Sequence, residues 1–110
     1  MSRFTQAVYS VVRQIERGQV MTYREVAMAI GAPRAARAVG SALHRNSTPV
    51  IIPCHRVVKS NGDVGGYVHG RERKEALLQS EGVGVRNGCV SREFFIQSLS
   101  LHNGKETVNK

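Results

Sequence analysis

Residues 22–45 read TYREVAMAIGAPRAARAVGSALHR, two helical patterns separated by Gly31. The first pattern opens on a capping box, because a threonine at position 22 and a glutamate at position 25 can each bond a backbone N–H of the same first turn. Apolar residues follow at helical spacing. The sequence therefore predicts a short helix from Thr22 to about Gly31.

The second pattern is rich in alanine and begins after Pro33. Proline suits the first position of a helix, where its missing N–H costs nothing. The segment Arg34–Arg45 has no helix breaker except Gly40, so a second helix is predicted there. Two short helices joined at a glycine indicate a helix-turn-helix.

Two further segments carry helical patterns. Between Phe4 and Arg17 the apolar residues recur at helical spacing, and Gly18 is a natural stop. The segment Arg71–Ser80 is predicted to be helical as well. Its side chains expected to point inward are Ala76, Leu77 and Leu78.

The segment between these helices predicts extended chain. Thr48–Val58 contains two prolines and several β-branched residues, a pattern typical of buried extended chain. Asn61-Gly62 is a strong signal for a tight turn. Val83, Val85 and Val90 flank a second such signal, Asn87-Gly88, which predicts a hairpin that includes Cys89. Ser91 is placed to cap a last short helix containing Phe94, Phe95 and Leu99.

The predicted fold class is α-rich with short β-strands, arranged as a winged helix-turn-helix-like single domain. The chain has 110 residues, of which 41% are hydrophobic, enough for one modest core. We expect the domain to span residues 1–101 and residues 102–110 to form a disordered tail.

The charge of the chain favours a polyanionic partner. Sixteen Lys and Arg against eight Asp and Glu leave a net charge of +8, which suits nucleic acid, although it could also serve solubility alone. We expect a soluble, intracellular protein, because no apolar run reaches the roughly 20 residues of a membrane span and no signal-peptide pattern is present.

Cys54 is the candidate nucleophile. It lies between Pro53 and His55, so a thiol and a base that could ionise it are adjacent in the chain. The plainer alternative is a buried thiol beside a hydrogen-bonded core histidine. Cys89 stands far away without a Cys-x-x-Cys unit, and the histidines are scattered, so we expect no disulfide framework, metal or cofactor.

The segment around Cys54 resembles a known active site. Ile52-Pro-Cys-His-Arg-Val-Val58, preceded by Asn46 and followed by Asn61-Gly-x-Val-Gly-Gly-Tyr67, is similar to the active-site block of O6-alkylguanine-DNA alkyltransferases. The resemblance runs in order from Phe4 to Gly82, about four-fifths of the chain.

This resemblance implies a single, irreversible transfer of an alkyl group from O6-alkylguanine in DNA to Cys54. His55 would deprotonate the thiol through a water, and Glu81 would orient His55. Tyr23 would donate a proton to the departing guanine. Asn46 would brace the turn after the recognition helix through bonds to local backbone groups.

The resemblance also implies a substrate pocket and a DNA surface. The pocket would contain Tyr23, Val57, Tyr67 and Val68, with backbone groups of Cys54, Val57 and Val68 contacting the guanine. Helix 34–45 would enter the minor groove of the duplex, and Arg37 would hold open the gap left by the extruded nucleotide. The protein would bind DNA as a monomer. The other residues expected at the DNA are Arg34, Ala35, Ala36, Gly40 and Arg45.

Three points stay open. Many family members carry a further N-terminal domain, which we expect this chain to lack. The alternative function is that of short relatives without the cysteine, which bind O6-alkylguanine lesions and recruit other repair factors; the retained Cys54 favours transfer. Val68-His69 differs from many relatives, so the preferred alkyl group is undecided. A winged-helix transcription factor would explain the charge but not Pro53-Cys54-His55.

Overall fold

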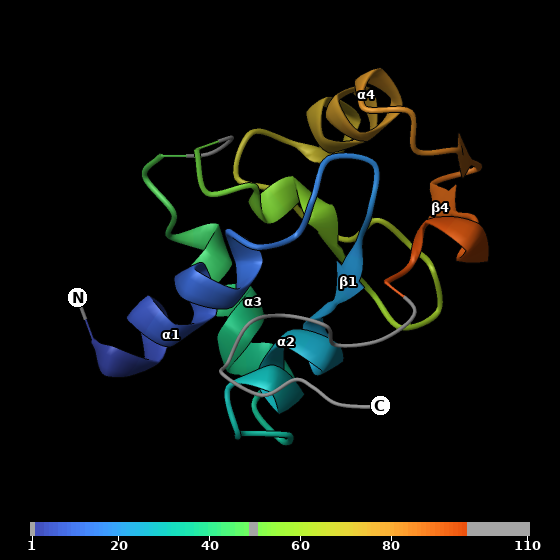
Figure 1. The fold of residues 1–110 in the computed structure, drawn as a ribbon. Helices are drawn as coiled ribbons and strands as arrows, with labels where there is room; N and C mark the ends of the chain where they lie inside the picture. The colour runs from blue at the N-terminus through green and yellow to red at the C-terminus, as the bar shows by residue number, and fades with distance from the viewer. Residues whose placement is uncertain (1, 49–50, 97–110) are drawn as a thin grey trace.

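The computed structural model describes residues 2–48 and 51–96 (Figure 1). Three helices pack against one another at one end of the molecule: α1 (Arg3–Val12), α2 (Tyr23–Ala29) and α3 (Ala36–His44). At the other end lie α4 (Arg71–Ser80) and an antiparallel hairpin of β3 (Val85–Arg86) and β4 (Cys89–Val90). A parallel pair, β1 (Met21–Thr22) with β2 (Val57–Val58), connects the two ends. Two 3-10 turns complete the fold, η1 (Cys54–Arg56) and η2 (Arg92–Phe94).

The β1–β2 pair divides the interior into two apolar clusters. Successive side chains of a strand point to opposite sides. Accordingly Met21 and Val57 belong to the cluster under α1, α2 and α3, whereas Val20 and Val58 belong to the cluster under α4 and the hairpin. All four are fully buried. Cys54, three residues before β2, belongs to the first of these clusters.

The capping box at the start of α2 is confirmed. The Glu25 amide donates to Thr22 Oγ1 at 3.0 Å, and the Thr22 amide donates to Glu25 Oε1 at 2.9 Å. Because Thr22 also ends β1, α2 begins directly from the strand. Tyr23 is consequently fixed as the first residue of the helix.

Helix α3 begins later than predicted, at Ala36 instead of Arg34. Residues 32–35 form a turn, closed by a hydrogen bond of 2.9 Å from the Ala35 amide to the Ala32 carbonyl. Pro33 occupies the second position of this turn, where its fixed φ is favourable. The proline thus builds the turn between α2 and α3 and not the first position of α3.

Helix α1 ends at Val12, short of the predicted end at Arg17. The Ile15 amide donates to the Val12 carbonyl at 3.0 Å, so the chain tightens into a turn after the helix. Ile15 is still 1% exposed and belongs to the core. The helical spacing of apolar residues therefore predicted burial correctly beyond the helix itself.

The segment 48–58 is predicted to be extended and largely buried. Burial is confirmed for most of residues 51–58, but the extended conformation is wrong around Cys54. Cys54 lies in η1, where the Arg56 amide donates to the Pro53 carbonyl at 2.9 Å. Ile51 is 72% exposed. Pro53 lacks an N–H to pair in a strand, so a turn at this point costs no backbone hydrogen bond. Residues 49 and 50 lie outside the described part.

The remaining predictions are largely confirmed. Helix α4 has the predicted bounds, with Leu78 buried and Leu77 half-buried, but Ala76 is exposed. The Asn87-Gly88 hairpin forms with a positive φ at both residues, 53° and 77°. The predicted last helix is reduced to η2, whose first turn has no side-chain cap from Ser91. Leu99 and residues 102–110 lie outside the described residues.

Taken together, the described residues form the α-rich, short-stranded architecture that the sequence predicts. None of their helices is long and apolar enough to cross a membrane.

Candidate functional site

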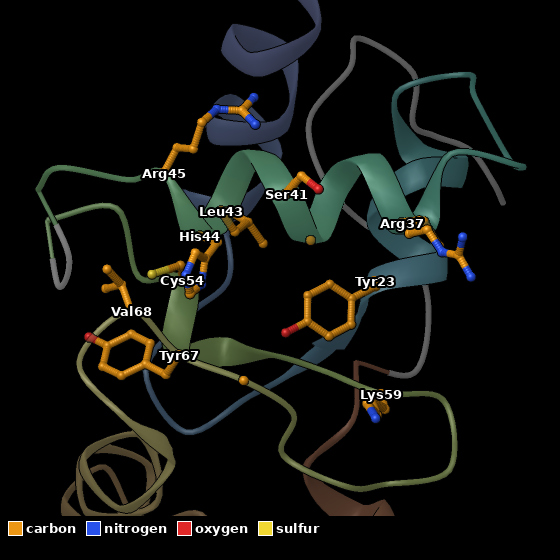
Figure 2. Close-up of a pocket in the computed structure, with 13 residues that line it drawn as sticks. Tyr23, Arg37, Ser41, Leu43, His44, Arg45, Cys54, Lys59, Tyr67 and Val68 are labelled. Carbon is orange, nitrogen blue, oxygen red and sulfur yellow. The ribbon is translucent and has the colours of Figure 1, made fainter.

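A cavity of about 690 Å³ opens beneath α3 (Figure 2). Cys54 lies at one end of it, and the Tyr23 ring projects into it from α2. Arg37 and Arg45 stand at opposite ends of α3, with their guanidinium groups directed away from Cys54. The full lining is Tyr23, Ala36, Arg37, Gly40, Ser41, Leu43, His44, Arg45, Cys54, Lys59, Gly66, Tyr67 and Val68.

The Cys54 thiol is buried and held by Asn46. The Asn46 side-chain amide donates to the Ile52 carbonyl at 3.0 Å and to Cys54 Sγ at 3.4 Å. Its oxygen accepts the Thr48 amide at 2.9 Å. Asn46 therefore bonds local backbone groups, as the resemblance implies, and in addition contacts the thiol.

Burial raises the pKa of the Cys54 thiol, although the hydrogen bond from Asn46 and the charge of Lys74 oppose the shift. A thiol of raised pKa is mostly protonated at neutral pH and is a weak nucleophile. If Cys54 reacts as a thiolate, a neighbouring base must take its proton.

His55 is the base nearest in sequence, and it belongs to a hydrogen-bonded chain of titratable groups. The His55 ring is fully buried, and its Nε2 lies 2.9 Å from Glu81 Oε2. Arg56 holds the same carboxylate by two hydrogen bonds, from Nε at 3.0 Å and from Nη2 at 2.8 Å. The third nitrogen of Arg56 donates to the Ile15 carbonyl at 2.7 Å. Segments 41 residues apart are thus tied together at this site.

The pKa shifts of His55 and Glu81 favour a neutral imidazole beside an ionised carboxylate. Burial lowers the pKa of His55, against the opposing hydrogen bond with Glu81. Burial alone would raise the pKa of Glu81, but the hydrogen bonds from Arg56 and His55 outweigh it and the pKa is lowered. A neutral imidazole beside a carboxylate donates from Nε2. His55 Nδ1 is then an acceptor; it is buried and has no hydrogen-bond partner within residues 2–48 and 51–96.

Tyr23 lies across the cavity from Cys54 with its ring between two glycines. A Cβ at Gly40 would lie 3.8 Å from the ring, and a Cβ at Gly65 would lie 3.2 Å from the Tyr23 hydroxyl oxygen. Burial and the neighbouring Cys54 raise the pKa of Tyr23 to about 12. The phenol is therefore protonated at neutral pH and can donate a hydrogen bond into the cavity.

Lys74 is a site residue that the sequence reasoning missed. Its side chain is fully buried, and its ammonium donates to Tyr23 Oη, to the Val57 carbonyl and to the Gly66 carbonyl. The available signal was its position on α4, four residues before Leu78 and hence on the buried face. The sequence marks Arg56 as a cation close to Cys54, but its pairing with Glu81 was not predicted.

The α3 residues expected at DNA are only partly brought to the cavity. Ala36, Arg37, Gly40 and Arg45 line it, whereas Arg34 lies in the turn before α3 and Ala35 at its N-cap. Ser41 and His44 on α3, and Lys59 after β2, line the cavity without having been expected there.

The expected pocket residues differ in their exposure. Tyr67 is 8% exposed and Val68 37%, and both line the cavity. Val57 is fully buried and does not line it. Within residues 2–48 and 51–96, no group of three His, Cys, Asp or Glu side chains is placed to hold a metal ion.

Comparison with known proteins identifies one family. The family model described as "6-O-methylguanine DNA methyltransferase, DNA binding domain" matches residues 3–83. A relative named methylated-DNA–protein-cysteine methyltransferase, from Methanosarcina acetivorans, is 44% identical over 81 residues, which cover 74% of this chain and 52% of the relative. The chain spans about half the length of the first curated relatives that it matches.

Solved structures agree with this similarity. Mycobacterium tuberculosis OGT in complex with DNA is 44% identical, with a TM-score of 0.72 over 74% of this chain and 50% of that one. S. pombe Atl1 in complex with damaged DNA containing O6-carboxymethylguanine is 30% identical, with a TM-score of 0.79 over 89% of this chain and 98% of that one.

Proposed function

The chain belongs to the family of 6-O-methylguanine DNA methyltransferase DNA-binding domains, and on this premise we propose that it repairs DNA by taking the alkyl group of O6-alkylguanine onto Cys54. The observation that carries the proposal is the array of Asn46, Cys54, His55 and Glu81, of which Cys54 lines the cavity under α3. A buried thiol, a neutral base and an ionised carboxylate that orients the base are the parts that a nucleophilic transfer needs.

In the proposed reaction His55 Nδ1 takes the thiol proton through a water, and Glu81 stabilises the imidazolium that results. The thiolate attacks the alkyl carbon in line. The S–C bond forms as the C–O6 bond breaks, and its electron pair goes to the guanine. The product is a stable thioether, so each molecule would act once.

Tyr23 would serve the leaving group. Guanine departs as an anion unless a ring nitrogen is protonated, so a donor at that nitrogen lowers the barrier. The Tyr23 hydroxyl is neutral at physiological pH, because its pKa is about 12, and it reaches into the cavity that contains Cys54. The proton lost by Tyr23 would enter the guanine as the bond to O6 breaks.

If Tyr23 has this role, a side chain at position 65 that displaces its hydroxyl should slow transfer. Gly65 has φ +78°, and a Cβ there would lie 3.2 Å from Tyr23 Oη. We expect Gly65→Ala to slow transfer and to lower the free energy of unfolding by about 1–3 kcal/mol, because the backbone is strained and the hydroxyl is displaced. Single-turnover transfer and urea unfolding measure the two effects. Gly31→Ala is the matched control, since Gly31 has φ +79° and a Cβ there would meet nothing within 4 Å; equal slowing of transfer in both variants would contradict the role.

DNA binding would place α3 in the minor groove. The small residues Ala36 and Gly40 on α3 permit close approach to the duplex, and the net charge of +8 favours it. The alkylated base must leave the stack to reach Cys54. Arg37, exposed near the start of α3, would fill the gap, and the protein would act as a monomer inside the cell.

Arg37→Ala should therefore impair extrusion of the base. Unstacking a base costs a few kcal/mol, so we expect transfer from duplex DNA to slow by about tenfold, which corresponds to 1.4 kcal/mol. Reaction of Cys54 with iodoacetamide should not change. Arg13→Ala, exposed at the end of α1, is the control for lost charge. A matching loss in both variants would count against a role specific to Arg37.

The direct test is the mass of the intact protein after incubation with a duplex containing O6-methylguanine. We expect a gain of one methyl group, mapped to the peptide that contains Cys54. Unchanged mass with tight binding would instead support the second candidate, lesion binding without transfer. The similarity to Atl1 bound to damaged DNA favours that candidate, whereas the retained Cys54, bonded to Asn46, favours transfer.

A further inference from the structure

Lys74 is a buried cation that donates its hydrogen bonds to neutral oxygens. Its side chain is fully buried on α4, and no carboxylate of residues 2–48 and 51–96 forms an ion pair with it. Removing a charge from water is costly unless hydrogen bonds compensate. A buried titratable group with a shifted pKa next to a cavity often indicates a functional site.

The hydrogen bonds of Lys74 determine the direction in which the Tyr23 hydroxyl can donate its proton. An ammonium has three donors and no acceptor. The three contacts of Nζ are the Val57 carbonyl at 2.7 Å, the Gly66 carbonyl at 3.0 Å and Tyr23 Oη at 3.3 Å. The Tyr23 oxygen must therefore accept from Lys74, and its own proton must point elsewhere. The open side of Tyr23 is the cavity.

We propose that Lys74 is a positioning residue that holds the Tyr23 hydroxyl as a proton donor to the substrate and stabilises the phenolate left after the proton is given away. The inference rests on the proposed alkyl transfer. When Tyr23 protonates guanine, its oxygen becomes negative while His55 holds the thiol proton, so the net charge is unchanged. The bond from Lys74 then joins opposite charges and strengthens, which favours the transition state over the ground state.

This arrangement depends on pH. The groups that act on Lys74 electrostatically are Cys54, Arg71 and Asp63, and those that it contacts or shifts are Tyr23 and His55. Burial lowers the pKa of Lys74 to about 8. Above that pH the neutral amine has a lone pair that can accept a hydrogen bond from the Tyr23 hydroxyl. The O–H would then point towards Lys74 and away from the cavity. The contribution of Lys74 is thus present below about pH 8 and lost as pH rises through it.

The test is a double-mutant cycle on single-turnover methyl transfer from an O6-methylguanine duplex. We expect Tyr23→Phe to slow transfer by about 100-fold and Lys74→Met by about tenfold. The double variant should be no slower than Tyr23→Phe alone, because Lys74 acts through the hydroxyl. A double variant slowed by the product of the two factors overturns the inference, since Lys74 would then act on Cys54 or on the fold independently of Tyr23.

The pH profile provides a second readout that needs no change at Lys74. The wild-type rate should fall as pH rises through about 8, and Tyr23→Phe should lose that fall. The same fall in both proteins overturns the inference, even if Lys74→Met does not fold. Arg73→Met, exposed on the same helix, controls for the loss of a cation and should leave both readouts unchanged. A wild-type protein that gains no methyl group overturns the proposed function itself, whereas transfer with multiplicative losses overturns only the role of Lys74.

Discussion

Cys54→Ser is expected to gain no methyl group from an O6-methylguanine duplex while binding that duplex as the wild type does. A serine hydroxyl has a far higher pKa than a thiol, so His55 cannot supply a useful concentration of the nucleophile. The side chain lies at the end of the cavity, and the exposed arginines of α3 point away from it. Intact mass measures the transfer, and a gel-shift titration with the same duplex measures the binding.

The second cysteine is the matched control for this experiment. Cys89 is exposed in β4, on the hairpin beyond α4, and does not line the cavity. Cys89→Ser should therefore accept a methyl group at the wild-type rate. Methylation of Cys54→Ser, or its loss in Cys89→Ser, would contradict the assignment of Cys54.

The parts of the fold that local sequence specifies were predictable. The capping box joins residues three apart, and the Asn87-Gly88 turn needs only the two residues that accept a positive φ. Helix α4 begins after Gly70 and contains good helix formers. Each of these signals is complete within a few residues, so it does not depend on the rest of the chain.

The site depends instead on contacts that local patterns do not contain. Arg56 bonds both Glu81, 25 residues later, and the carbonyl of Ile15, 41 residues earlier. Periodicity marks position 74 as inward-facing, but a lysine there reads as a surface residue until Val57 and Gly66 present carbonyls to it. The resemblance supplied Cys54, His55 and Glu81 as a set, yet Cys54 lies in a 3-10 turn where extended chain was expected.

Glu81→Ala is expected to reduce both stability and transfer. The carboxylate accepts from His55 and twice from Arg56, and its side chain is 8% exposed. Its removal leaves a buried imidazole and a largely buried guanidinium without their partner, a loss of about 3 kcal/mol in the free energy of unfolding. Without its orienting group His55 is a poorer base, so transfer should slow by about 100-fold. Urea unfolding and single-turnover transfer report these two effects.

Two further variants separate charge from orientation. Glu75 lies in α4, and Glu75→Ala removes only a partly exposed contact of 3.5 Å to Arg71. It should lower the free energy of unfolding by less than about 1 kcal/mol and should not slow transfer. Glu81→Gln keeps an oxygen that can accept the His55 N–H but loses the charge that pairs with Arg56. It should therefore recover more of the transfer rate than of the stability. Recovery of stability without rate would mean that Glu81 serves the packing of Arg56 against Ile15 and does not orient His55.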